Sequence, residues 1–397
     1  MRTSNLIIAI LLLTVAALAG CGGGGSTPQT VLTGVVMAGP VAQATVTAFG
    51  VTANGTKGDQ LAAPTTTSSQ GIYSINVGNY TGAVLLEVTG GSYTDEATGA
   101  TRTIAATLRA AVMTGSGTNV VNVTPLTELA VQKMPALNAT AIASVNKDIG
   151  DLFKIPGITT TTPVVATGST AATAPTAQKE YGLVLAALSQ TLANQGTAAT
   201  LETMLAGFAA DVTLTAGQTP ASLGSAANGA YKLGMADFLV NPRNLSGITT
   251  LANAPFNANA AKIALLRIST GTLAENVIGA DFSFNLPVGA SIGTTGSSTP
   301  PEAAAGTVVA SGVAVNGVTT GSTYAASTRT VRVLLAEANG FGAGELATVA
   351  VSLAAGSTLT ETDFQNAAAF VVTKFARVSD GAALSPAPTL TLTATIF

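Results

Sequence analysis

The sequence predicts a multidomain protein of β and α structure, in which two antiparallel β-sandwiches flank an all-α helical module. Short runs of alternating apolar residues, separated by turns rich in glycine and asparagine, predict strands over residues 31–123. Residues 124–257 instead place apolar side chains at helical spacing. From residue 258 to residue 397 the alternation returns, so strands are expected on both sides of the helices.

The chain begins with the pattern of a secretory signal. A single charge, Arg2, precedes an apolar run over residues 6–18, which is too short for a membrane-spanning helix. This run leads directly into Cys21, the only cysteine of the chain. The junction resembles the lipobox of bacterial lipoproteins, and its small or apolar residues are Leu18, Ala19 and Gly20. The alternative is that Cys21 is an unmodified thiol of a folded domain.

The lipobox resemblance implies where the protein is held. Residues 1–20 would be removed as a signal peptide, and Cys21 would become the lipidated N-terminus of the mature chain. The glycine-rich residues 21–30 are then expected to form a flexible tether. Gly22 stands where enteric lipoproteins retained at the inner membrane have Asp, so we expect the outer membrane of a bacterial envelope, on its periplasmic or surface face.

Composition excludes several classes of protein. Cleavage after residue 20 would remove Arg2 and no acidic residue, which leaves 15 basic and 19 acidic side chains and a net charge of −4. The basic residues are scattered, whereas nucleic-acid binding needs clustered Lys and Arg, so we expect no nucleic-acid partner. A single cysteine allows no intramolecular disulfide, so stability must come from apolar burial.

The absence of histidine is the strongest negative observation. It excludes Ser-His-Asp catalysis and the zinc and haem sites that use histidine. Residues 289–293, Gly-Ala-Ser-Ile-Gly, match the nucleophile elbow of hydrolases in spacing only. Such an elbow needs a histidine base and a following helix, and residues 294–298 predict a loop. We therefore predict no catalytic residue, no metal ligand and no cofactor.

The first strand region carries a recognisable spacing. The spacing is Gly34-x-Val36-x-x-Gly39-Pro40-Val41-x-x-Ala44-x-Val46, and it is followed by Thr67-x-x-x-Gly71-x-Tyr73-x-Ile75. This spacing resembles the bacterial carboxypeptidase-regulatory-like domain, which implies an immunoglobulin-like β-sandwich over residues 31–123 and no peptidase activity. Tyr73, with Tyr80 and Tyr93, either lies in the sandwich core or lines a ligand face.

At residue 124 the pattern changes to helix. In Thr124-Pro125-Leu126-Thr127-Glu128, a threonine cap, a proline at the first position and an acid in the first turn all indicate a helix start. Five amphipathic helices fit residues 126–240, one of them introduced by Thr219-Pro220, and residues 159–176 are expected to form a flexible low-complexity loop. The segment resembles the helical module of uncharacterised envelope lipoproteins. Lys179, Glu180 and Tyr181 form either a polar site or a solvated face with one core tyrosine.

The last region supplies strands at five places, which are residues 263–268, 282–286, 331–335, 346–351 and 390–396. Together with Gly340, Gly342 and Gly344, which are expected to turn the chain between two strands, this series is similar to the cohesin-like domain. The resemblance implies a β-sandwich over residues 258–397 and an adhesion or carbohydrate-associated role.

Few residues of this last region are candidates for ligand contact. Tyr324 lies beside a Gly/Ser/Thr loop, and an exposed position would make it a tentative ligand contact. Isolated aspartates either cap turns or hold calcium, and they are Asp281, Asp363 and Asp380.

The sequence therefore predicts a lipid-anchored envelope protein that acts without catalysis, as a binding, adhesion or scaffolding module for a surface protein or a polysaccharide. The alternative is an accessory or catalytic subunit in polysaccharide breakdown or export, because a carboxylate pair can hydrolyse glycosides without histidine.

Overall fold

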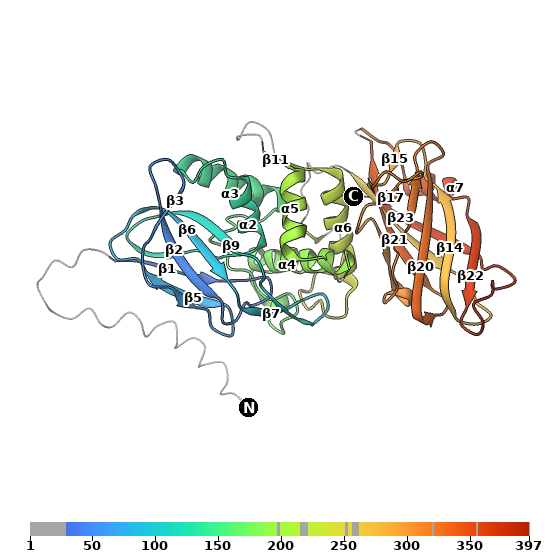
Figure 1. Ribbon diagram of the computed structural model, residues 1–397, viewed down its shortest axis with the longest axis horizontal. Coiled ribbons are helices and arrows are strands. Elements are labelled where there is room, and N and C mark those ends of the chain that lie inside the picture. The colour runs from blue at the N-terminus through green and yellow to red at the C-terminus, as the bar shows by residue number, and fades with distance from the viewer. Residues whose placement is uncertain are drawn as a thin grey trace, which may run out of the picture.

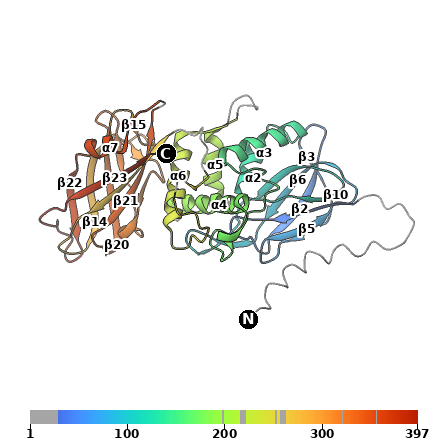
Figure 2. The same ribbon diagram turned by 180° about the vertical axis from the view of Figure 1, so that it is seen from behind.

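A computed structural model of the protein describes residues 29–196, 199–214, 221–250, 253–255, 262–319, 321–354 and 356–396. The described chain has mixed β and α structure, with six sheets and six α-helices. Strands lie at both ends of the elongated molecule and most helices lie between them (Figures 1 and 2). The predicted signal peptide, Cys21 and Thr219-Pro220 lie outside the described residues.

Two sheets form the core of the N-terminal β region. The smaller has the order β10-β1-β5, and its strands are β1 (Thr30–Val35), β5 (Ile72–Asn76) and β10 (Gly117–Val120). The larger has the order β3-β2-β6-β9, with β4 also paired to β2. Its strands are β2 (Thr45–Val51), β3 (Lys57–Gln60), β4 (Thr65–Thr66), β6 (Gly82–Thr89) and β9 (Leu108–Thr114). The pair β1–β10 is parallel, and the other strand pairs of these two sheets are antiparallel.

The two sheets share one hydrophobic core. Alternation directs Val46 and Ala48 inward from β2, and both side chains are completely buried. They belong to the same apolar cluster as Leu32 and Ile75 of the other sheet. This arrangement is compatible with a β-sandwich.

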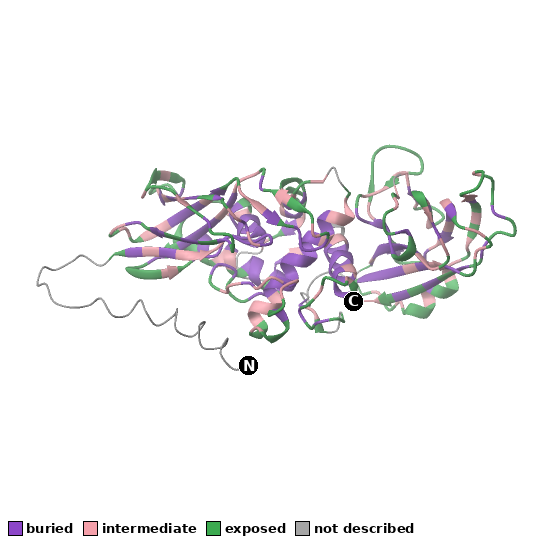
Figure 3. Ribbon diagram, turned by 90° about the horizontal axis from the view of Figure 1, so that it is seen from below, coloured by how far each residue is buried: buried purple, intermediate pink, exposed green. Residues whose placement is uncertain are grey.

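The middle region contains five helices, as predicted, but the last begins later than expected, because Ser222–Leu223 forms the short strand β12, which pairs with β11 (Val212–Thr213). The helices are α2 (Pro125–Lys133), α3 (Ala139–Phe153), α4 (Thr176–Asn194), α5 (Leu201–Asp211) and α6 (Ser225–Val240). Threonine capping boxes begin α2 and α5, and the side chain of Asn138 caps α3. Buried residues run along these central helices (Figure 3).

Residues 159–176 are packed against the fold, which differs from the flexible loop expected from their composition. The carbonyl of Thr159 accepts a hydrogen bond from the Asn122 amide at 2.7 Å. Ala166 is completely buried, and its carbonyl accepts from the Leu245 amide at 2.9 Å. Small side chains allow this segment to lie close against the helices, so the low-complexity composition reflects close packing.

The N-terminus of α2 connects the strands to the helices through buried polar contacts. The Tyr181 hydroxyl donates to the Ile158 carbonyl at 2.9 Å, so Thr124 donates its hydroxyl proton to Tyr181 at 2.7 Å. The Thr127 hydroxyl donates to the carbonyl of Arg109, on β9, at 2.8 Å. The apolar cluster of the N-terminal sheets also includes residues from α2 to α6, so the core continues across the change of pattern at residue 124.

The C-terminal β region also has two sheets with a common core. One has the order β15-β21-β13-β23, with β18 also paired to β21, and the other has the order β16-β17-β19-β20-β14-β22. Leu266 and Val349 of the first sheet lie in one apolar cluster with Phe282 and Val333 of the second. The strands of the first sheet are β13 (Ile263–Thr270), β15 (Ala290–Ser291), β18 (Val308–Ala310), β21 (Glu345–Leu353) and β23 (Leu390–Ile396).

The predicted glycine turn connects β20 of the second C-terminal sheet to β21 of the first. Gly340 and Gly344 have φ values of 72° and 140° beside the reversal from β20 to β21, which confirms the need for glycine at these two positions, whereas Gly342 is not among the residues with positive φ. A short helix that was not predicted, α7 (Glu361–Ala367), contacts β23. The strands of the second sheet are β14 (Val277–Asn285), β16 (Thr294–Thr295), β17 (Glu302–Ala303), β19 (Thr323–Ala325), β20 (Thr330–Phe341) and β22 (Val371–Arg377).

Helix α6 attaches the C-terminal β region to the rest of the molecule. Leu233 and Ala236 pack against β13, β18 and β21 in a small apolar cluster. Beside this cluster, Arg267 of β13 lies 3.7 Å from Asp237 of α6 and 2.9 Å from Glu345 of β21. Within the described part of the chain, no helix is long and apolar enough to cross a membrane.

Replacing Tyr181 with Phe tests the contacts at the start of α2. We expect the free energy of unfolding to fall by about 1–3 kcal/mol, because the Ile158 carbonyl and the Thr124 hydroxyl each lose a buried partner. Urea denaturation measures the change. The control is Tyr324→Phe, which removes a single 3.4 Å contact and should cost less. Equal losses in the two variants would contradict the importance of this junction.

Candidate functional site

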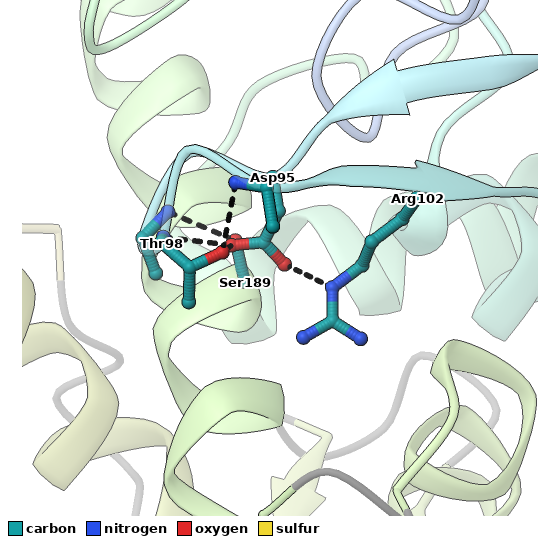
Figure 4. A network of polar contacts seen from close by, with 6 residues as sticks. Asp95, Thr98, Arg102 and Ser189 are labelled. Carbon is teal, nitrogen blue, oxygen red and sulfur yellow. Dashed lines mark hydrogen bonds and ion pairs between the residues drawn. The ribbon is translucent and has the colours of Figure 1, made fainter. Parts of the chain in front are cut away.

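A short hairpin on the N-terminal β region forms a rigid polar unit (Figure 4). It comprises β7 (Ser92–Thr94) and β8 (Thr101–Thr103) and the turn between them. Asp95 is 1% exposed, and its Oδ1 accepts from both the amide and the hydroxyl of Thr98 at 2.9 Å. The Ala97 amide donates to the Ser189 hydroxyl of α4 at 3.2 Å. The hairpin is therefore fixed internally and against the helices.

The same aspartate orients Arg102. Oδ2 of Asp95 accepts from Nε of Arg102 at 2.7 Å, and the outer edge of the guanidinium points away from the carboxylate (Figure 4). Within the described part of the chain, Nη1 and Nη2 of Arg102 donate no hydrogen bond. A guanidinium held in this way presents two parallel N–H donors at little conformational cost.

Arg102 lines a cleft of about 830 Å³ between the N-terminal β region and the helices. One wall comes from the hairpin and β9, and the other comes from α2, α4 and the start of α5. The wall of helices is apolar at Leu192, Leu201 and Leu205. Tyr93 is 6% exposed and also lines this cleft. The sequence left open whether this tyrosine lies in the core or lines a ligand face, and in the structure it does both.

An ion pair lies in this first cleft. Arg109 of β9 donates from Nε and Nη2 to the two carboxylate oxygens of Glu128, at 3.0 and 2.6 Å. Gln132 donates to the same carboxylate at 2.9 Å. Glu128 is 4% exposed, and its hydrogen bond raises the pKa of Arg109. The sequence predicted only that Glu128 favours the start of a helix. In the structure, Glu128 also joins α2 to β9 through Arg109.

The other lining carboxylates lie in different surroundings. Glu87 pairs with Lys57 at 2.5 Å, and Glu202 is exposed in the first turn of α5. The cleft thus combines N–H donors that lack a partner among the described residues, carboxylate acceptors and an apolar wall. Such a set suits an uncharged polar ligand that both donates and accepts hydrogen bonds.

Glu96 anchors the hairpin from behind without lining the cleft. It is 3% exposed and accepts from the Thr167 amide at 3.2 Å. Burial raises the pKa of Glu96 to about 8, although backbone donors at residues 166 and 167 act in the opposite direction. The carboxyl group is therefore mostly protonated at neutral pH.

Of the residues predicted as lipidation or ligand sites, the structure describes Tyr324, which does not line this cleft. Cys21 and its preceding residues, Leu18, Ala19 and Gly20, lie outside the described residues. Tyr324 does not have the exposed position that would make it a ligand contact, because its side chain is 5% exposed and lies in the apolar core, with its hydroxyl 3.4 Å from the Ala290 carbonyl. The alternation of β19 points this residue inward, whatever the composition of the adjoining loop.

The three aspartates of the C-terminal region have separate local partners. Asp281 accepts a bidentate pair of hydrogen bonds from Arg332, and Asp363 accepts from the Thr360 amide at the start of α7. Asp380 pairs with Arg377 at 2.5 Å. Among the described residues, no group of three potential metal-ligating side chains is found.

Two other sequence alternatives are resolved by the structure. Tyr181 is completely buried, so the interpretation of a core tyrosine holds for residues 179–181. After the Gly289–Gly293 motif comes the short strand β16 and not the helix that a nucleophile elbow needs, although the loop predicted for residues 294–298 is wrong at Thr294–Thr295.

Sequence reasoning missed the cleft and its two arginines. Arg102 and Arg109 are single basic residues within strands, and no local motif marks them. One signal could have pointed to them. Only 9% of the residues are charged, so each arginine within a predicted strand stands out, and a half-buried arginine needs a carboxylate partner.

No protein-family model matches this chain, and no curated protein matches it. The geometry of the cleft and the sequence patterns are therefore the basis for the functional argument.

Replacing Glu96 with Gln tests the buried acid. Because folding raises its pKa, Glu96 contributes stability that is full below its ordinary pKa of 4.5 and is lost as pH rises through about 8. We expect the unfolding free energy of the wild type to decrease between about pH 5 and pH 8, and the Gln variant to show a smaller decrease. Denaturation at several pH values measures this slope. The exposed Glu361→Gln is the control, and an unchanged slope in E96Q would contradict the assignment.

Proposed function

We propose that this protein is a lipid-anchored component of the bacterial cell envelope that binds a polysaccharide in the first cleft without chemically altering it. The lipobox-like residues before Cys21 support the anchor and an outer-membrane location. The position of Arg102, held by buried Asp95 with its outer N–H groups in the cleft, carries the binding proposal.

The proposed architecture has an immunoglobulin-like sandwich, a helical unit and a cohesin-like sandwich. Paired sheets that share an apolar core at each end of the chain support this assignment. The motifs that resemble the carboxypeptidase-regulatory-like and cohesin-like domains lie in the corresponding strand regions. Such domains on a flexible tether are suited to contact with material outside the membrane.

The chemistry of the first cleft favours a saccharide. Sugar hydroxyls both donate and accept hydrogen bonds, so they can pair with the donors of Arg102 and with the carboxylate of Glu202. The C–H faces of sugar rings can pack on Leu201 and Leu205. A neutral ligand also leaves the Arg109–Glu128 pair intact, whereas an anion would compete for its guanidinium.

The same contacts favour binding over hydrolysis. A glycosidase needs one carboxylic acid that protonates the leaving oxygen and a second carboxylate on the other side of the bond. Both oxygens of Glu128 already accept hydrogen bonds from Arg109, and Glu87 is paired with Lys57. The oxygens of these two carboxylates are therefore already engaged by cationic side chains of the protein, which favours binding of a ligand over its hydrolysis.

Replacing Arg102 with Gln tests ligand binding in the first cleft. Against a panel of neutral and acidic oligosaccharides, we expect the variant to bind the preferred glycan about tenfold more weakly, because a charged donor pair is lost. Arg332→Gln is the control, since Arg332 pairs with Asp281 in the C-terminal region. Measured release of reducing ends would instead favour the alternative of a catalytic or accessory subunit, and capture of a surface protein in place of glycan would also contradict the proposal.

Replacing Cys21 with Ser tests the anchor. Acyl chains contribute roughly 0.8 kcal/mol for each buried CH₂, so a lipidated cysteine holds a protein firmly in the membrane. We expect the variant to be folded and to leave the membrane fraction, as measured by fractionation and immunoblotting. Retention of C21S in the membrane at the level of the wild type would contradict lipidation.

A further inference from the structure

A second cleft, of about 690 Å³, lies between the end of α4 and the C-terminal β region. Its lining is rich in side-chain amides, and of its described lining residues only Glu302 is charged. The hairpin that carries Arg102 borders this cleft with its turn, at Ala97 and Thr98. The amide residues of the lining are Gln190, Asn194, Gln195, Asn241 and Asn316.

Three of these amides form a directed chain of hydrogen bonds. Asn241 donates from Nδ2 to the Ala97 carbonyl at 3.0 Å and to Oε1 of Gln190 at 3.2 Å. Gln190 then donates from Nε2 to Oδ1 of Asn194 at 2.9 Å. Asn194 donates from Nδ2 to Oδ2 of Asp237 at 2.9 Å. The chain links the hairpin, α4 and α6.

Asp237 sets the direction of this chain. An ionised carboxylate only accepts hydrogen bonds, so the amide nitrogen of Asn194 must face it, and the carbonyl oxygen of Asn194 must face Gln190. Arg267 and Glu345 lie on the other side of Asp237, at the contact with the C-terminal sheet. The side chains of the cleft are therefore oriented before any ligand arrives.

The oriented amides keep unused bonding capacity. Among the described contacts, Gln190 and Asn194 each use one N–H and one oxygen lone pair, which leaves each with one N–H and one lone pair. Both are half-buried and lie four residues apart on α4, so they are neighbours on one face of the helix. Two donor–acceptor pairs therefore lie side by side along the cleft.

We propose that the second cleft is a separate binding site for an uncharged saccharide chain. Adjacent hydroxyls of a sugar present donors and acceptors along one edge, which matches the amides of α4. An extended peptide instead alternates its groups between two sides, and an anionic ligand would lack a counter-charge here, because the charged residue of the described lining is Glu302. On the opposite wall the exposed Val315 and Val318 offer apolar surface for the C–H faces of the rings.

This proposal extends the proposed function to a second place on the molecule and rests on it for the class of ligand. Arg102 lines the first cleft and not the second, so a variant of Arg102 should weaken ligand binding in the first cleft only.

Calorimetry on the full chain in detergent tests the second site, with cellohexaose, maltohexaose and laminarihexaose as neutral probes and hexagalacturonate as the acidic one. We expect one neutral probe to bind and to lose about tenfold in affinity in Gln190→Ala, since about one hydrogen bond is removed. Asn316→Ala, on the exposed opposite wall, should also weaken binding without affecting the fold. The control is Gln70→Ala, an exposed amide outside both clefts.

The outcomes distinguish the two proposals. Binding that persists in R102Q and is weakened in Q190A and N316A supports the second site. Binding lost in R102Q and kept in both amide variants overturns the second site and leaves the first cleft as the ligand site. Preference for hexagalacturonate in the second cleft, or no binding of any neutral probe, also overturns this proposal.

Discussion

The buried N-terminus of α2 joins the N-terminal strands to the central helices, and the packing of both depends on it. A helix start leaves backbone N–H groups without intrahelical partners, and burying them without other partners is costly. Here Thr124 accepts from the amides of residues 126 and 127, and Tyr181 fixes Thr124 from α4. Because these polar groups are satisfied within the protein, the helices pack directly on the N-terminal sheet and share its core.

This junction also creates the first cleft. The contact between α2 and β9 brings Glu128 beside Arg109, and the hairpin extends past this pair to present Arg102. The chain has few charges, and Arg109, Glu128 and Asp95 each have an ionic partner. Among the described contacts, the outer N–H groups of Arg102 donate to no other residue, so they are open to a ligand. The proposed binding site is thus a consequence of how strands and helices are joined.

The end of α4 lies between the two clefts. Leu192 lines the first cleft, while Gln190 and Asn194 line the second, and the hairpin contributes to both. The two clefts differ in chemistry, since the first uses ion pairs and the second uses amides oriented by Asp237. If the chain is anchored at Cys21, both clefts belong to a body that extends from the membrane on the glycine-rich tether.

Periodicity, caps and turn residues are local properties, so they predicted the order of strands, helices and strands, the five central helices and the glycine turn near residue 342. The sequence by itself also determined the absence of histidine chemistry and the motif at Cys21. Tertiary structure alone decided that residues 159–176 are packed, that Tyr324 lies in the core and that Arg102 and Arg109 lie in one cleft. These features depend on contacts between residues far apart in the chain, such as Arg109 with Glu128 and Asn241 with Ala97, and no local pattern encodes such pairings.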